Sequence, residues 1–341
     1  MNAFTNYLEK FGSNFLVAAM IPSLGLVIAC MVVFDPLFNL STALQTEEGI
    51  YPLIGISLLV LVPTVIIGFT LTALNTFILK VFEGYIFIDK LPLLKESHSR
   101  KAEKLLGEIN QIKEKIEKIE QKKRKSNPEK DLLDELQTAY YVKVAEYDKS
   151  YPPLHAGIMP TKFGNILKAS EAYTGSRYGI DAVEFWPRLL HAIPPTYRQS
   201  IDEARNELSF LVNMSTLSYI FFVFCALALV TNVLIPNTPN LGNDILNSLR
   251  YGAAGLLSMG SIWFFNKAAL YSVGDFGAMI RSSYDLFRLD LLSQYRIKHP
   301  KNSVEEFEVW KNLGELTILG QASMNFEPLT YDIKNNIKSK S

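Results

Sequence analysis

Long apolar runs alternate along the chain with strongly polar segments. A helix needs about 20 mostly apolar residues to cross a bilayer, because every backbone amide in hydrocarbon must be bonded within its own segment. Four runs qualify, at residues 14–34, 51–79, 208–235 and 251–271. The fourth is the weakest, since Asn266 and Lys267 fall near its end. We therefore expect an all-α integral membrane protein with two transmembrane helical hairpins.

Between the second and third runs, apolar residues recur at alternating steps of four and three from Leu105 to Ile119, which is typical of a coiled-coil seam. The pattern breaks at Asn127 and Pro128, a pair that suits the start of a new helix. A returning stripe follows at Leu132, Leu133, Leu136, Tyr140 and Val144. We expect an antiparallel coiled-coil hairpin. Its tip would carry the basic run 122–125, which we interpret as solvated rather than as a contact with lipid or nucleic acid.

A further apolar stripe follows the fourth run. Its members lie at steps of three or four residues, as on one face of a helix: Phe276, Ile280, Tyr284, Phe287, Leu291 and Tyr295. Arg281, Asp285 and Arg288 fall elsewhere at i, i+4 and i, i+3 spacing. We expect these three on a solvated face with local ion pairs.

Charge is segregated along the 341 residues, which have a mean hydropathy of +0.12 and a formal net charge of zero. A balanced total charge gives no global field that would favour nucleic acid or an acidic substrate. Lys and Arg are absent from 11–79 and 206–249 but crowd 90–205. Cytoplasmic loops carry the excess of basic residues. We therefore expect both termini and the central segment in the cytoplasm.

These patterns divide the chain into five expected parts, with the central insertion between the two hairpins. They are a first transmembrane hairpin (1–90), a coiled-coil hairpin (91–150), a juxtamembrane helical motif (151–205), a second transmembrane hairpin (206–275), and a cytoplasmic amphipathic helix with a tail (276–341).

Cysteine and histidine usage predicts neither a disulfide nor a metal site. Cys30 and Cys225 lie inside apolar runs, where a free cysteine behaves as a small buried hydrophobe. The four histidines are scattered without metal-ligand spacing. We expect no cofactor.

The segment 160–190 holds the densest set of unusual polar residues. Thr161 can cap a helix that runs through Tyr173 and stops at Thr174 and Gly175. Asp181 then opens a second helix with an Asp-x-x-Glu capping pattern. Tyr178 and Trp186 are amphipathic aromatics of the kind found at membrane interfaces.

Eight residues of this segment are candidates for a functional or structural motif: Gly164, Asn165, Glu171, Arg177, Tyr178, Asp181, Trp186 and Arg188. Arg177 has two carboxylates nearby in sequence for a fork-like ion pair. The segment contains no P-loop, dinucleotide-binding, zinc-protease or nucleophile-elbow motif. Because charge clusters also arise in structural ion-pair networks, we favour a structural role over catalysis.

The strings PTKFGN, RYGIDAVEFWPRLL and SYDLFRLDLLSQYRI, followed by EEFEVWKNL, carry a resemblance. The chain looks like an uncharacterised group of bacterial multi-spanning membrane proteins with similar Pro-Thr, Gly-Asn, Arg-Tyr-Gly-x-Asp and Trp-Pro-Arg elements. The resemblance covers 160–313 and implies a bacterial inner-membrane protein. It implies no activity.

Three functions stay open at this point. The first is a membrane-anchored structural or interaction protein that self-associates and docks a cytoplasmic protein through the coiled coil. The second is a channel or pore, suggested by four polar residues in or beside the spans: Asn75, Asn213, Asn266 and Lys267. The third is a juxtamembrane enzyme that acts on lipid or nucleotide, holds phosphate with Arg177 and Arg188, and uses Glu171 or Asp181 as a base. The expected partners are the lipid bilayer and further copies of the chain, and no nucleic acid is expected.

Overall fold

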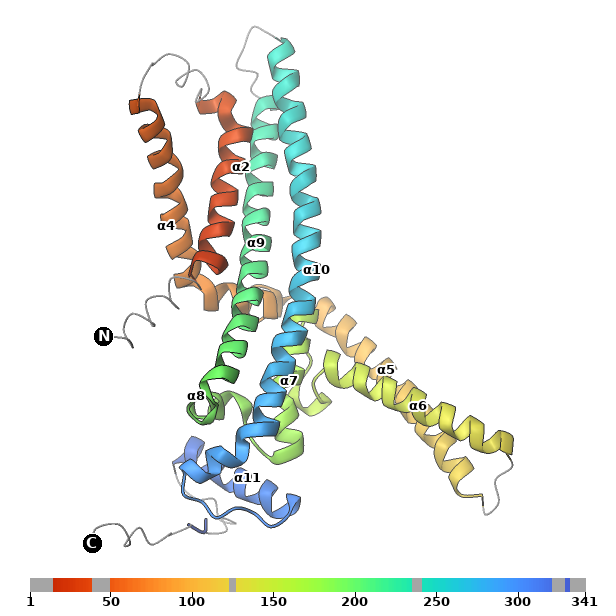
Figure 1. Ribbon diagram of the computed structural model, residues 1–341. Coiled ribbons are helices and arrows are strands. Elements are labelled where there is room, and N and C mark those ends of the chain that lie inside the picture. The colour runs from red at the N-terminus through yellow and green to blue at the C-terminus, as the bar shows by residue number, and fades with distance from the viewer. Residues whose placement is uncertain (1–14, 39–49, 123–126, 235–240, 321–328, 332–341) are drawn as a thin grey trace, which may run out of the picture. The chain divides into compact units, whose positions relative to one another are not determined.

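The computed structural model describes residues 15–38, 50–122, 127–234, 241–320 and 329–331. These residues are helical almost throughout and contain no β-strand, only one isolated bridge between Ile297 and Tyr331 (Figure 1). The expected all-α class is therefore confirmed. The chain forms two compact units. Residues 1–82 and 203–272 make up the first unit, and 83–202 and 273–341 the second.

The first unit is built from apolar helices. Its elements are a π-helical turn η1 (Leu16–Met20), α2 (Ile21–Phe38), nearly all of α4 (Ile50–Glu83), and parts of α9 (Pro195–Leu234) and α10 (Leu241–Gln294). Among the described residues, three helices are long and apolar enough to cross a membrane: Leu16–Asp35, Ile54–Glu83 and Pro195–Leu234. Three of the four expected spans therefore coincide with helices that could cross a bilayer.

The fourth expected span, 251–271, lies inside α10 but is not one of these three helices. Its serines, glycines, Asn266 and Lys267 make it less apolar than the other spans. It nevertheless exposes large apolar side chains, among them Leu256, Leu257 and Trp263. Its place in a membrane therefore stays a prediction.

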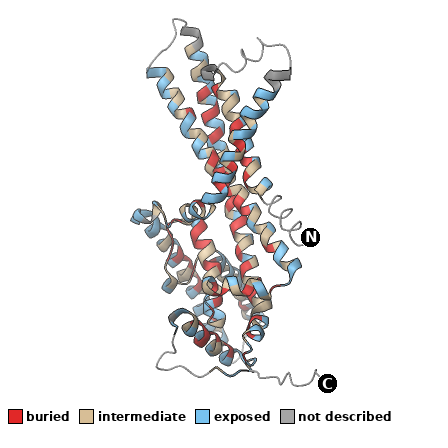
Figure 2. Ribbon diagram, turned by 90° about the vertical axis from the view of Figure 1, so that its left-hand side faces the viewer, coloured by how far each residue is buried: buried red, intermediate tan, exposed pale blue. Residues whose placement is uncertain are grey.

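One buried cluster of the first unit contains two stacked aromatic rings. The ring of Phe34 stacks on that of Tyr251 with 5.7 Å between centroids, and Cys225 and Ala254 complete a small buried cluster. Exposed residues follow the helices of this unit over much of their length (Figure 2), and many of them are large and apolar, such as Leu61 and Leu227. A surface of this kind is costly in water and suits lipid.

The second unit contains shorter, more polar helices. They are η2 (Ile88–Lys90), α5 (Pro92–Glu120), α6 (Asn127–Ser150), η3 (Leu154–Ala156), α7 (Lys162–Tyr178), α8 (Ala182–Ala192) and α11 (Ser303–Leu319), together with the ends of α9 and α10.

Helices α5 and α6 lie side by side as an antiparallel pair (Figure 1). Leu105, Ile109 and Ile116 of the expected seam are buried, while Leu132 of the expected returning stripe is exposed. The Lys143 Nζ atom lies 3.0 Å from Glu108 Oε2 across the pair. Residues 123–125 of the basic run lie outside the described residues.

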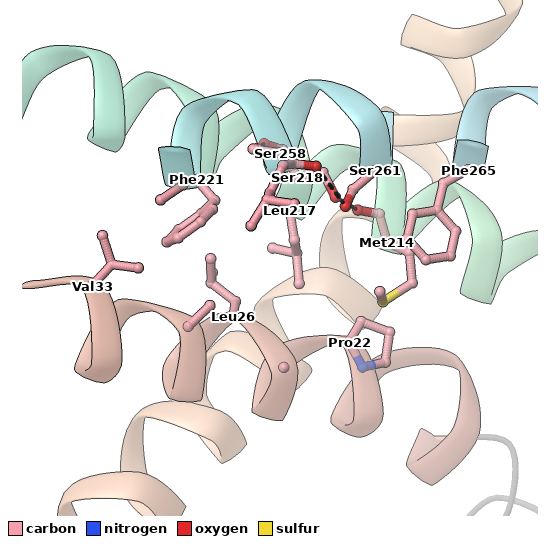
Figure 3. A pocket seen from close by; sticks show the side chains of 14 residues that line it. Pro22, Leu26, Val33, Met214, Leu217, Ser218, Phe221, Ser258, Ser261 and Phe265 are labelled. Atoms are coloured by element: carbon pink, nitrogen blue, oxygen red, sulfur yellow. Dashed lines mark hydrogen bonds between the residues drawn. The ribbon is translucent and has the colours of Figure 1, made fainter. Parts of the chain in front are cut away.

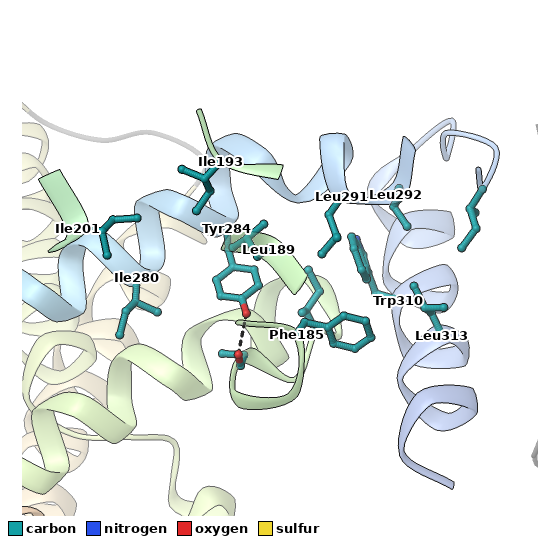
Figure 4. Close-up of a cluster of buried hydrophobic side chains, with 13 residues drawn as sticks. Phe185, Leu189, Ile193, Ile201, Ile280, Tyr284, Leu291, Leu292, Trp310 and Leu313 are labelled. Atoms are coloured by element: carbon teal, nitrogen blue, oxygen red, sulfur yellow. Dashed lines mark hydrogen bonds between the residues drawn. The ribbon is translucent and has the colours of Figure 1, made fainter. Parts of the chain in front are cut away.

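The main core of the second unit collects side chains from α8, α10 and α11, with Ile201 from α9 (Figure 4). Ile280, Tyr284 and Leu291 of the expected stripe are buried there, and Phe276, Phe287 and Tyr295 pack against them. This stripe is therefore confirmed. The Tyr284 hydroxyl donates to the carbonyl oxygen of Ala182 at 2.7 Å, so even the deepest tyrosine has a hydrogen-bond partner.

Candidate functional site

The start of α7 is attached to the end of α4 by one threonine. The Thr161 hydroxyl donates to the carbonyl oxygen of Glu83 at 2.8 Å and accepts from the backbone N–H of Gly164 at 2.9 Å. The second bond is the helix cap that the sequence predicts. One side chain thus begins α7 and satisfies a carbonyl at the end of α4, which would otherwise have no partner within its own helix.

Gly164 is required by the closeness of this contact. A Cβ atom at this position would lie 2.1 Å from the Glu83 carbonyl oxygen, which is backbone and cannot rotate away. A side chain at position 164 would therefore push α7 off the end of α4. Close packing against the Glu83 carbonyl therefore explains the glycine of the Gly-Asn element.

Asn165 fixes the turn that precedes α7. It is fully buried. Its Oδ1 accepts from the N–H of Met159 at 2.8 Å, and its Nδ2 donates to the carbonyl oxygens of Met159 and Thr161 at 2.8 and 2.7 Å. Both amide hydrogens and the amide oxygen are therefore used within the fold.

Farther along, α7 crosses α10 at very short range. A Cβ atom on Gly277 would lie 2.2 Å from the Ser170 hydroxyl oxygen. The same hydroxyl accepts from Arg281 Nη1 at 2.8 Å. The crossing therefore depends on a glycine on one helix, a small polar residue on the other, and one arginine beside them.

A polar cluster joins α7, α10 and α11. We call it the Asp285 cluster, and its members are Tyr173, Tyr178, Asp285, Arg288 and Glu306. The Tyr178 hydroxyl donates to Asp285 Oδ1 at 2.6 Å, and the Tyr173 hydroxyl donates to Asp285 Oδ2 at 3.0 Å. Two phenols from one helix thus hold a single carboxylate on another.

Arg288 completes the cluster. Its Nε lies 2.7 Å from Glu306 Oε1, and its guanidinium carbon lies 4.0 Å from the centre of the Tyr178 ring. Arg288 also donates to the backbone carbonyl of Asp285. The side chains of Arg288 and Glu306 are only 17% and 11% exposed. This is a largely buried ion pair whose charges gain further hydrogen-bond and cation–π partners.

The expectation of a solvated face for Arg281, Asp285 and Arg288 is wrong. All three are partly buried and contact other helices. Each directly follows a residue of the apolar stripe, so each lies at the border of the buried face, where a neighbouring helix can reach it. That adjacency is the sequence signal that could have identified them.

Burial and hydrogen bonding keep the two phenols of the cluster protonated. Burial and the bond to Asp285 raise the pKa of Tyr178 to about 12. The same two causes raise the pKa of Tyr173. Near neutral pH both phenols therefore act as donors to Asp285, and neither is suited to act as a base.

Glu171 is the candidate whose ionisation is most altered. Its pKa is raised to about 7, chiefly by burial and next by the charge of Glu83, while Lys168 opposes the rise and Asp181 adds to it. A carboxyl group that exchanges its proton near neutral pH has the property expected of a general acid or base. Structural charge clusters produce the same shift, so the pKa alone does not define a catalytic site.

The remaining motif residues take part in local contacts. Asp181 Oδ1 accepts from the N–H of Glu184 at 3.0 Å, as the capping pattern predicts. Arg188 pairs with Glu184 at 2.8 Å. Arg177 lies over the Tyr173 ring at 4.7 Å, and its contact is with this ring rather than the expected fork-like carboxylate pair.

One further expectation for the segment needs correction. Helix α7 does not stop at Thr174 and Gly175 but continues to Tyr178, because the residue that adopts the left-handed cap conformation is Gly179, with φ of 73°. Trp186 and Tyr178 are partly buried: the Trp186 ring lies 6.1 Å from the Tyr284 ring, and Tyr178 belongs to the Asp285 cluster. Their place at a membrane interface stays a prediction.

The four polar residues in or beside the expected spans differ in their hydrogen bonding and exposure within the first unit. Asn213 Nδ2 donates to the carbonyl oxygen of Ala18 at 2.8 Å, and Asn266 Nδ2 donates to the Tyr219 hydroxyl at 3.0 Å. The Oδ1 atom of Asn75 is buried without a hydrogen-bond partner, and Lys267 is exposed. Two of the four therefore join segments, as polar groups commonly do between membrane helices.

The first unit also contains a cavity of about 350 Å³ between α2, α9 and α10 (Figure 3). Small and apolar residues line it, including Gly25, Leu217 and Ala254. The Ser258 hydroxyl at its edge donates to the carbonyl oxygen of Ser218 at 2.8 Å. The lining contains no charged residue.

Comparisons with known proteins do not identify the chain. No family model, no curated protein and no solved structure matches it. The resemblance stated from the motifs therefore stays a prediction. Within the described residues, no group of three or more His, Cys, Asp or Glu side chains could hold a metal ion.

Proposed function

We propose that this chain is a membrane-anchored structural and interaction protein that self-associates. The observation that carries the proposal is how the motif segment uses its polar groups. Four of its polar side chains form hydrogen bonds within the second unit: Thr161, Asn165, Asp181 and Tyr178. Because these hydrogen bonds are internal, they favour a structural role for the segment over a catalytic one.

The proposed topology has two transmembrane hairpins with a cytoplasmic insertion between them, in a bacterial inner membrane. Three apolar helices support it directly. The fourth span draws support from the exposed apolar side chains of α10 and from the absence of Lys and Arg in 206–249. Under the positive-inside rule, this charge distribution places both termini and the insertion in the cytoplasm.

The α5–α6 hairpin is the proposed docking element. Its inner face is used for packing, whereas Tyr141 and Val142 of α6 are exposed to solvent at 70% and 62%. Exposed aromatic and branched side chains on a charged helix are typical of a contact surface. The proposed occupants are a second copy of the chain or a cytoplasmic protein.

The pore and the enzyme have less support. Asn213 and Asn266 donate hydrogen bonds within the first unit, which accounts for two of the polar residues that suggested a pathway. Arg188 pairs with Glu184, so only Arg177 and Glu171 keep features that an enzyme acting on a phosphate ester could use.

Two measurements test the proposal. The first is the mass of the purified full chain in detergent, and the second is photo-crosslinking in cells. We expect a defined oligomer, and adducts from a photoreactive residue at Tyr141 but not from one at the buried Leu105. A monomer that gives no Tyr141 adduct would contradict the interaction function. Ion flux through vesicles containing the purified chain would instead favour the pore.

A further inference from the structure

An apolar surface follows the end of α4. Five large apolar side chains within residues 84–94 are exposed: Tyr85, Phe87, Leu91, Leu93 and Leu94. Phe87 is 70% exposed and Leu93 is 77% exposed. Because exposed apolar surface is unfavourable in water, a group of five such side chains this close together favours an apolar partner.

The backbone of this segment is bent sharply and holds these side chains close to the helix end. Phe87 has φ of 64° and ψ of −44°, the rare and strained conformation at the centre of a γ-turn. The N–H of Ile88 donates to the carbonyl oxygen of Ile86 at 2.7 Å, and the N–H of Leu91 donates to that of Ile88 at 3.0 Å. A tight turn therefore takes the chain from α4 into α5.

Sequence continuity indicates what covers this surface. The apolar helix Ile54–Glu83 ends directly before the segment begins. A chain advances at most about 3.6 Å per residue, so Tyr85 and Phe87 lie within roughly 15 Å of the helix end. The headgroup region on each side of a bilayer is about 5–8 Å thick. A membrane crossed by α4 would therefore have its interface at these side chains.

Charge along the segment agrees with a lipid partner. Lys80 precedes it, and Lys90 and Lys95 lie within residues 84–95, where they outnumber the single acidic residue, Asp89. All three lysines are exposed. Aromatic rings and lysines together are typical of the boundary between headgroups and acyl chains, where a lysine is attracted to anionic lipid. The pattern fits an anionic lipid surface better than a protein groove, which would cover all the side chains alike.

We propose that residues 84–95 form an interfacial anchor. Tyr85, Phe87, Leu91 and Leu93 lie in the headgroup–acyl boundary of the leaflet at which α4 ends, and Lys90 and Lys95 contact lipid phosphates. The anchor rests on the proposed membrane function. It would fix the height at which the second unit begins, because Thr161 and Gly164 attach α7 to the carbonyl of Glu83 within that unit.

Nitroxide labels on the full chain test the anchor. Cys30→Ala and Cys225→Ala provide a background without native thiols, reconstituted in vesicles of phosphatidylcholine and the anionic lipid phosphatidylglycerol. Single cysteines then replace Phe87, Leu93, Val304 or Leu61. Val304 of α11 is the matched aqueous control, because it is 73% exposed and lies outside the proposed docking element. Leu61 of α4 reports whether the helix itself lies in lipid.

Labels at 87 and 93 should collide more with oxygen, which concentrates in lipid, than with a water-soluble nickel chelate. The label at 304 should show the reverse. Lipid-like behaviour at 61 with aqueous behaviour at 87 and 93 overturns the anchor alone. Aqueous behaviour at 61 overturns the membrane function as well. Labels at 87 and 93 shielded from both quenchers point to a protein contact and also overturn the anchor.

The natural chain provides a second readout that leaves both cysteines in place. A photoreactive phenylalanine analogue at position 87 should form adducts with phospholipid, and the same analogue at 141 should not. Adducts at 87 with a protein, or with neither protein nor lipid, overturn the anchor.

Discussion

Asn165 in the second unit and Asn213 in the first are both buried, but they differ in how many hydrogen bonds their side chains form. Asn165 is fully buried in the second unit and makes three hydrogen bonds. Asn213 is 2% exposed in the first unit, makes one hydrogen bond to Ala18, and leaves its Oδ1 without a partner. Asn165 thus uses all of its hydrogen-bonding groups, whereas Asn213 leaves its amide oxygen without a partner.

The two units also differ in the kind of contact that they contain, although His98, Trp310 and Glu315 of the second unit each have one buried polar atom without a partner. The second unit buries an ion pair, two phenols on one carboxylate, and a helix cap joined to a carbonyl of α4. The first unit exposes apolar side chains and has a small core around Cys225. We infer that directional polar contacts specify the second unit, and that apolar contacts, including those with lipid, hold the first. Each prediction below tests this difference through the stability of the full chain.

The largest expected effect is that of Arg288→Ala. It leaves Glu306 largely buried without its partner, and breaking such a pair from one side costs about 3–5 kcal/mol. Arg100→Ala is the matched control, because the Arg100–Glu96 pair is exposed and should contribute less than about 1 kcal/mol. Thermal unfolding in detergent measures both. Equal losses would mean that the buried pair is not important for the second unit.

Asn165→Ala should have the next largest effect. It leaves the N–H and carbonyl of Met159 and the carbonyl of Thr161 without their present partners, at about 3 kcal/mol in total. Asn110→Ala on the exposed side of α5 should be neutral or slightly stabilising, since alanine is the better helix former. Denaturant unfolding of the two variants gives the comparison. Similar unfolding midpoints would contradict the assigned role of Asn165.

The sequence predicted the features that depend on local pattern. The caps at Thr161 and Asp181 and the stripe from Phe276 to Tyr295 follow from spacing alone, and the structure has them. The Asp285 cluster could not be predicted, because Tyr173 and Asp285 lie 112 positions apart in sequence. The partner of a charged residue at the border of a stripe depends on which helix packs there, and helical periodicity does not contain that information.

Glu171 should make the stability of the second unit depend on pH. Its pKa in the fold is about 7 against an ordinary 4.5, so the folded chain holds a proton that the unfolded chain releases. Stability should therefore fall, on the order of 2 kcal/mol, as pH rises from about 4.5 to about 7, and show no further change from this group above that range. Glu171→Gln should remove this slope. An identical pH profile for wild type and variant would show that Glu171 ionises normally.

The smallest expected effect is that of Asn213→Ala in the first unit. The variant loses the hydrogen bond to Ala18 but also removes the buried Oδ1 that has no partner, so the two consequences oppose each other. Side-chain hydrogen bonds between membrane helices contribute about 0.6 kcal/mol on average, and we expect a loss of that size or smaller. Unfolding of the variant in lipid–detergent micelles, beside Asn165→Ala under the same conditions, measures the difference directly. A loss as large as that of Asn165→Ala would remove the contrast between the units, because the first unit would then also depend on a specific polar contact. Unchanged stability with a new ion leak in vesicles would instead place Asn213 in a pathway and favour the pore.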